Sequence, residues 1–91
     1  MESLKIEYKP SENILKELKV STWPIWAKDP SEFDREYEMP ETCFFFEGEA
    51  NLIPEDGDPV EIKSGTLLSI PAQFKCRWVI SKELKMRYLL G

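Results

Sequence analysis

The chain has 91 residues, 42% of them hydrophobic and 32% charged, which is the balance of one ordinary globular domain. Its net charge of -5 argues against sequence-independent binding to nucleic acid, which depends on neutralising phosphates, and against a polybasic membrane anchor. No histidine is present, so His-based catalytic triads and His-bound metal sites are excluded.

Cysteine content and the start of the chain indicate the compartment. Cys43 and Cys76 are the only cysteines, too few for a disulfide-rich secreted framework or a four-thiolate zinc site. The first residues carry no apolar segment of the signal-peptide kind. Apolar runs such as Phe44-Phe45-Phe46 are far too short to span a bilayer. We therefore expect a cytoplasmic protein with both thiols reduced.

The N-terminal residues 1–19 are expected to form a short strand and a short helix. Apolar and charged residues alternate over residues 4–8, which is the period of a half-buried strand, and Pro10 ends it. Ser11 is placed to cap a helix of about two turns. The apolar face of that helix carries Ile14, Leu15 and Leu18.

The remaining chain reads as short strands separated by turns. The aromatic segment 22–26 contains a proline, so it is an edge strand or a packed connection. Gly48 predicts a bend or bulge within a strand. The predicted strands cover residues 33–37, 41–52, 60–63, 67–70, 74–79 and 84–88. The predicted turns cover residues 54–57, 64–65 and 81–83. This pattern is typical of an all-β sandwich or barrel.

Two blocks of sequence resemble the two halves of the cupin signature. Glu41 and Gly48 have the spacing of the glutamate and last glycine of the first motif, and Gly65 and Pro71 fit the glycine and proline of the second. The segments Trp23-Pro24-Ile25-Trp26 and Cys76-Arg77-Trp78 are more particular. They resemble small stand-alone cupins of unknown function grouped with the ethanolamine-utilisation EutQ and ureidoglycine aminohydrolase relatives.

The resemblance covers roughly residues 20–90 and implies the fold. It implies that residues 1–91 form a single small cupin-type β-barrel, or jelly roll, with one short N-terminal helix. Cupins frequently dimerise through sheet edges, so a homodimer is one expected arrangement. Neither nucleic acid nor a membrane is expected as a partner.

The usual metal ligands of the family are mostly replaced in this chain. Cupins usually hold one divalent metal with two histidines and a glutamate from the first motif and one histidine from the second. Counting back from Glu41 puts Arg35 and Tyr37 at the first two histidine positions, and Cys76 falls at the third. Three of the four ligands are therefore absent, and we expect no metal and no other cofactor.

If the cupin register holds, the substituted residues line the former metal cavity. The predicted ligand-binding residues are Arg35, Tyr37, Glu41, Cys43, Cys76, Trp78 and Trp26. Arg35 is expected either to pair with Glu41 or to bind an anionic ligand, because a buried charge without a partner is too costly to keep.

Three functions follow from this pocket. The first is a metal-free site for a small polar or anionic organic molecule. The second is an enzyme that uses Glu41, Tyr37 or Cys76 for acid–base or nucleophilic chemistry. The third is a structural or interaction module whose barrel is filled by aromatic side chains. Fold analogy cannot choose among them, because cupins host many unrelated activities.

Overall fold

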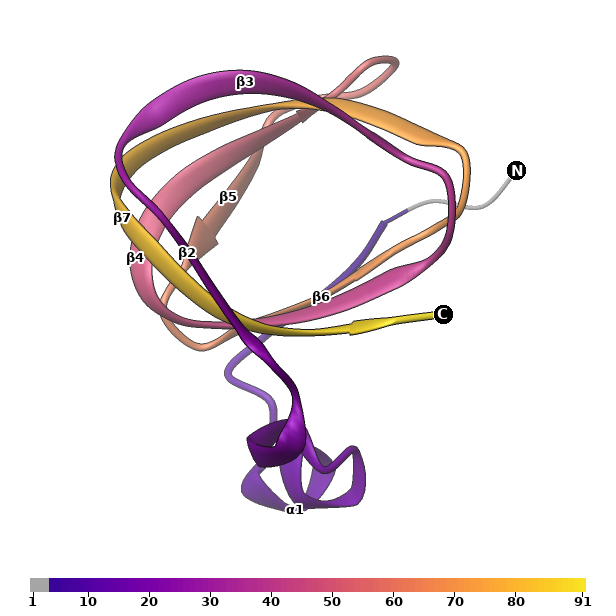
Figure 1. Ribbon diagram of the computed structural model, residues 1–91, viewed down its shortest axis with the longest axis vertical. Coiled ribbons are helices and arrows are strands. Elements are labelled where there is room, and N and C mark those ends of the chain that lie inside the picture. Colours follow the sequence, from indigo (N-terminus) through magenta and orange to yellow (C-terminus); the bar gives the residue numbers. More distant parts are fainter. Residues whose placement is uncertain (1–3) are drawn as a thin grey trace.

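The structure is a computed structural model that describes residues 4–91, and it is built mainly from strands. The elements in chain order are β1 (Lys5–Tyr8), α1 (Glu12–Glu17), the 3-10 helix η1 (Val20–Thr22), β2 (Ile25–Lys28), β3 (Ser31–Tyr37), β4 (Glu41–Pro54), β5 (Val60–Lys63), β6 (Thr66–Ile70) and β7 (Phe74–Leu90). Figure 1 shows the strands curving around a ring, with α1 outside it. The predicted all-β fold with one short helix is confirmed.

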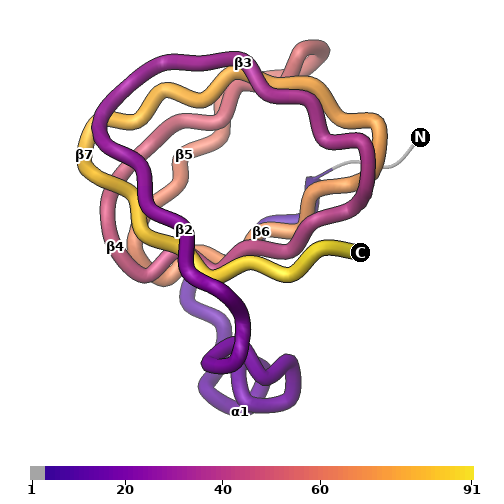
Figure 2. The backbone as a smooth tube through the Cα atoms, in the orientation of Figure 1, coloured from indigo at the N-terminus to yellow at the C-terminus, as the bar shows by residue number. Residues whose placement is uncertain are grey.

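Two long strands, β4 and β7, hold the barrel together. They pair antiparallel with each other along most of their length. The first half of β4 also pairs with β6 and its second half with β5, while β7 pairs with β3 and then with β2. β1 pairs with β6 and covers that edge within the same chain. Figure 2 traces how β4 and β7 bend together around the ring.

The bend in β4 lies at Gly48, as predicted. The β4–β7 register shifts between Phe45 and Ala50, which marks a bulged region. Gly48 has φ +102°, and a Cβ atom there would lie against the carbonyl of Glu83 and 2.8 Å from the Cα atom of Leu84. Only glycine allows the two strands to approach this closely at the bend.

The predicted turn at residues 81–83 is wrong, because β7 runs through this segment without interruption. All three of its residues are exposed and polar, which is why they resemble a turn. In the structure they lie across from the bulge. Ser81 Oγ donates a hydrogen bond to the Glu49 carbonyl at 3.2 Å, and Lys82 Nζ lies 3.5 Å from Glu49 Oε2. Residues 81–83 therefore stay extended within β7, and the irregularity lies in β4, at the bulge opposite them.

The interior of the barrel is filled by side chains from the inner faces of the strands. The cluster of buried residues consists of Tyr37, Cys43, Phe45, Ala50, Leu52, Ile62, Leu68, Ile70, Cys76, Trp78, Ile80, Leu84 and Met86. Val20, Trp23 and Leu67 are also buried but do not belong to this cluster. Burial of apolar surface in the core cluster and around these three residues stabilises the fold.

The helix α1 lies outside the barrel and is capped as predicted. The Ser11 side chain accepts a hydrogen bond from the Ile14 amide at 3.2 Å. None of its six residues is buried. Within residues 4–91, no helix is both long enough and apolar enough to cross a membrane.

Candidate functional site

Six of the seven predicted site residues come from three strands, β3, β4 and β7, that meet on the inside of the barrel. Arg35 and Tyr37 alternate with exposed residues on β3, and Arg35 lies opposite Cys76 of β7. The chain then turns and enters β4, whose first inward residues are Glu41 and Cys43. Side chains two residues apart on a strand share a face, and the pairing of β7 with both β3 and β4 brings the inward residues of these strands together.

A buried carboxylate and a partly exposed guanidinium form the centre of the site. Arg35 Nη2 lies 3.3 Å from Glu41 Oε1. Glu41 is 3% exposed, whereas the Arg35 side chain is 34% exposed. The pairing expected for Arg35 is therefore present, and the pair connects the barrel interior with the protein surface.

Cys43 uses the other oxygen of the same carboxylate. Its thiol donates a hydrogen bond to Glu41 Oε2, with a sulfur–oxygen distance of 3.1 Å. Burial raises the pKa of Cys43 far above its ordinary range, and the charge and hydrogen bond of Glu41 raise it further. The Cys43 thiol is therefore protonated and acts as a hydrogen-bond donor.

Tyr37 lies beneath the guanidinium and has an unused proton. The Arg35 Cζ atom is 4.4 Å from the centre of the Tyr37 ring, a cation–π contact. Trp78 Nε1 lies 3.1 Å from the Tyr37 hydroxyl. An indole N–H can only donate, so the Tyr37 oxygen accepts this bond. Among residues 4–91, no hydrogen bond donated by the Tyr37 hydroxyl is present.

The ionisation of Tyr37 and Cys76 is suppressed. Burial raises the pKa of Tyr37 well above its ordinary value of 10.0, against the opposing charge of Arg35. Burial likewise raises the pKa of Cys76 from 9.0 to about 11, with Arg35 lowering it and Asp34 raising it. Both groups are neutral near pH 7. We refer to Arg35, Tyr37, Glu41, Cys43 and Trp78 as the Arg35 cluster.

Trp26 lies apart from the Arg35 cluster. It is half-buried on β2, opposite Met86, and packs against the edge of the core. No hydrogen bond in the described part of the chain joins it to Arg35 or Glu41. The geometry thus brings together six of the seven predicted site residues and leaves Trp26 at the periphery.

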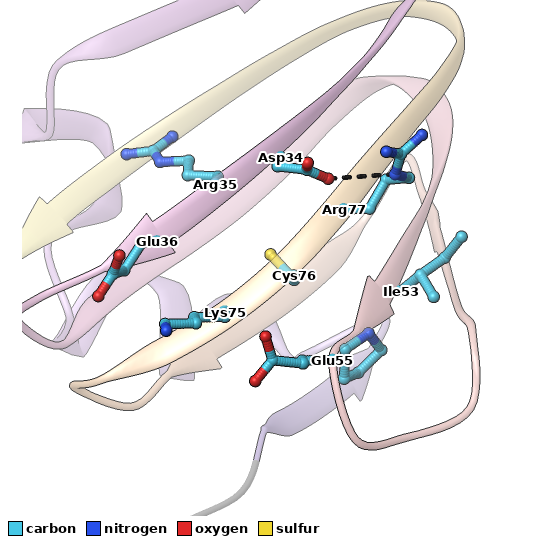
Figure 3. Close-up of a pocket in the computed structure, with 9 residues that line it drawn as sticks. Asp34, Arg35, Glu36, Ile53, Glu55, Lys75, Cys76 and Arg77 are labelled. Atoms are coloured by element: carbon cyan, nitrogen blue, oxygen red, sulfur yellow. Dashed lines mark hydrogen bonds and ion pairs between the residues drawn. The ribbon is translucent and has the colours of Figure 1, made fainter.

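A surface hollow of about 610 Å³ adjoins the cluster and is shared by β3, β7 and the end of β4 (Figure 3). Arg35 and Cys76 contribute to its lining. The other lining residues are Asp34, Glu36, Ile53, Pro54, Glu55, Lys75 and Arg77. Sequence reasoning missed these residues. The β3–β7 register accounts for two of them, because the pairing of Arg35 with Cys76 also sets Asp34 opposite Arg77. These two form an exposed ion pair at 3.1 Å.

The residues present do not fit the divalent metal that the cupin signature implies. Both oxygens of Glu41 are already engaged, one by a permanent cation and one by a thiol donor. A thiol must lose its proton to ligate a metal, and the pKa of both cysteines is raised. Within residues 4–91 there is no group of three or more acidic or cysteine side chains arranged to hold a metal ion.

The backbone carries the marks of the two cupin motifs. Gly48 of the first motif and Gly65 of the second both have a positive φ, which glycine adopts readily. A family model described as the EutQ-like cupin domain matches residues 15–88. The chain belongs to the EutQ-like cupin family. None of the curated proteins compared with this cupin matches it.

Several solved structures resemble this cupin. A DUF861 family protein from Thermotoga maritima is 42% identical with a TM-score of 0.93, and the match covers 98% of this chain and all of that one. A putative ethanolamine utilization protein Q from Salmonella typhimurium is 20% identical with a TM-score of 0.65, over 72% of this chain and 53% of that one.

The EutQ protein of Clostridium difficile is similar at the same level. It is 23% identical with a TM-score of 0.66, over 72% of this cupin and 52% of that chain. At identities this low, the likeness to both EutQ proteins shows the shared fold.

Proposed function

We propose that this cupin binds a small polar or anionic organic molecule at the Arg35 cluster, without a bound metal. The observation that carries the proposal is a set of unused donors in one place. Arg35 spends one N–H group on Glu41 and has no second acceptor among residues 4–91. The buried hydroxyl of Tyr37 also keeps a proton to donate. A ligand with two acceptor oxygens would use both.

The geometry favours a carboxylate or phosphate over a neutral ligand. A guanidinium presents its donors in a rigid fork that matches the oxygens of these anions. Glu41 and the ring of Tyr37 fix the plane of the Arg35 fork before a ligand arrives. Preorganisation of this kind reduces the ordering cost of binding. The adjoining hollow of about 610 Å³ is of the size of small-molecule sites, roughly 300–1,000 Å³.

The pKa values disfavour the nucleophilic version of the enzyme alternative. A cysteine nucleophile reacts as the thiolate, and both Cys43 and Cys76 hold their protons. We also propose a cytoplasmic location, which the two free thiols support. The homodimer stays a proposal. It is supported by β2, which pairs only with β7 among the described strands, so its other edge could pair with a strand of a second copy.

The test is a binding screen with a charge-matched control. Wild-type protein, Arg35→Gln and Lys82→Gln are screened by thermal shift against small mono- and dicarboxylates and phosphate monoesters, and hits are measured by calorimetry. Lys82→Gln removes one exposed positive charge on β7, away from the cluster. We expect compounds that bind wild type and Lys82→Gln and lose at least about tenfold in affinity for Arg35→Gln. Equal binding to all three proteins would place the ligand outside the Arg35 cluster and overturn the proposal, and no hit at all would favour the structural-module alternative.

A further inference from the structure

A second hollow lies outside the barrel, between the α1–η1 segment and the outer face of β4 and β7. Its volume is about 430 Å³. Figure 1 shows α1 standing away from the ring of strands, below β2 and β7. The apolar part of the lining is formed by Leu15, Val20, Phe44 and Phe46. We call this space the α1 hollow.

Arg87 in the α1 hollow differs from the other two arginines of the chain. Arg35 is paired with Glu41 and Arg77 with Asp34. Arg87 is half-buried, and within residues 4–91 no carboxylate lies within 4.0 Å of it. Its Nη1 atom donates to the carbonyl of Trp23 at 2.9 Å. The guanidinium is therefore held in place, and no described residue pairs with its charge.

The apolar lining of the α1 hollow is incompletely covered. Phe46 is 36% exposed, and Leu15 is half-buried although it lies on the apolar face of its helix. A well-packed helix would bury that face against the sheet. Exposed apolar surface beside a fixed cation is typical of a site for an amphipathic anion.

The charged residues at the rim limit the charge of the ligand. Besides Arg87, Lys16 adds a second positive charge to the lining, whereas Glu12 adds a negative one. Within residues 4–91, no salt bridge joins Glu12 to Lys16. The lining thus carries one excess positive charge. A ligand with a single carboxylate would balance it, while a second carboxylate would meet Glu12.

We propose that the α1 hollow binds a free organic acid with one carboxylate and an apolar chain. The carboxylate pairs with Arg87, and the chain lies on Phe44, Phe46 and Leu15. This site is separate from the Arg35 cluster, because Arg87 and Phe44 belong to the outer side of the sheet, beneath α1 and η1, and not to the inner core cluster.

The experiment uses octanoate as the probe and 1-octanol as its neutral counterpart, measured by calorimetry. Wild type, Arg87→Gln, Leu15→Glu and Lys82→Gln are compared, with near-UV circular dichroism to check the fold. We expect one octanoate per chain, at least about tenfold weaker binding of 1-octanol, and the same loss for octanoate in Arg87→Gln. Leu15→Glu should abolish binding, and Lys82→Gln, which removes an exposed positive charge outside both hollows, should leave it unchanged.

Chemical-shift mapping supplies the second measurement. The amides that shift with octanoate should centre on Phe44, Phe46 and Arg87. Absence of saturable binding to wild type, equal affinity in a folded Arg87→Gln, or shifts centred on Arg35 would overturn the proposal. If Arg87→Gln does not fold, the test is whether Leu15→Glu loses octanoate binding. That variant should fold, because Leu15 is only half-buried and lies on a helix outside the barrel.

Discussion

Cys43 donates a hydrogen bond to Glu41, the residue two positions before it on the inner face of β4, with sulfur and oxygen 3.1 Å apart. Arg35 engages the other carboxylate oxygen from β3. The buried carboxylate thus has a neutral donor on one side and a cation on the other. This arrangement satisfies a charge that would otherwise be costly to bury.

Arg35→Gln should destabilise the protein by about 1–3 kcal/mol, because it leaves the Glu41 carboxylate buried with only the Cys43 donor. The range is below that of fully buried pairs, because Arg35 is one-third exposed and solvent screens it. Urea unfolding measures the change. Adding Glu41→Gln to Arg35→Gln should recover part of the loss, since the charge is then absent. A double variant whose loss equals the sum of both single losses would show that the pair does not interact.

Both thiols should be protected from alkylation in the folded protein. With the pKa of Cys76 raised from 9.0 to about 11, its thiolate population at pH 8 falls about a hundredfold. Cys43 is 0% exposed and should react more slowly still. Mass spectrometry after iodoacetamide treatment, with and without denaturant, gives the rates. A folded protein in which Cys76 reacts faster than in denaturant would contradict the raised pKa.

The free energy of unfolding should fall as the pH rises from about 9 to about 11. Below pH 9 the Cys76 thiol is protonated in both states and contributes no pH dependence. Between these values the unfolded chain releases a proton that the folded chain keeps, which favours unfolding by about 1.4 kcal/mol per pH unit. Denaturant titrations across this range measure the slope, and Cys76→Ala should make it shallower. Cys43 and Tyr37, whose pKa values are also raised by burial, contribute to the slope in both proteins, so identical slopes would exclude Cys76 as a cause.

Gly48→Ala should be far more damaging than Gly65→Ala. Both glycines have positive φ, so both variants are strained by about 1 kcal/mol. A Cβ atom on Gly48 would also press on the backbone of Glu83 and Leu84, whereas nothing lies within 4 Å of the Cβ position on Gly65. We expect an additional loss of about 2 kcal/mol or more for Gly48→Ala by thermal unfolding. Similar midpoints for the two variants would mean that the strands at the bulge separate easily.

Removal of metal ions should leave the protein unchanged. Because the Glu41 carboxylate is engaged by Arg35 and Cys43, and the phenol of Tyr37 and the thiol of Cys43 keep their protons, a chelator should have nothing to extract. Elemental analysis of purified protein and thermal unfolding with and without EDTA test this. A stoichiometric transition metal, or a midpoint that falls with EDTA, would require the cluster to rearrange.

The strands and the inner residues were predictable because β-sheet periodicity is local. Alternation fixed the inward positions of Arg35 and Tyr37 on one strand and of Cys76 and Trp78 on another, and the cupin spacing aligned the strands. Long-range pairing was harder to predict. Residues 81–83 look like a turn, and their polar character is explained only by the bulge opposite them on β4.

Both hollows, the one beside the Arg35 cluster and the α1 hollow, depend on contacts that no local sequence pattern predicts. Asp34 meets Arg77 only through the β3–β7 register, across 43 positions of sequence. Arg87 reaches the carbonyl of Trp23 across 64 positions. Sequence periodicity predicts which face a side chain occupies, but it does not predict the neighbour from a distant strand.

The position of β7 in the chain has a consequence for biosynthesis. β2, β3 and β4 all precede β7 and all use it as a hydrogen-bonding partner. A nascent chain therefore cannot close the sheet until residues 74–90 have left the ribosome, and until then it exposes unpaired strand edges. Folding that depends on such distant pairings is slow, so this small domain should need chaperone protection during translation more than a helical protein of its size would.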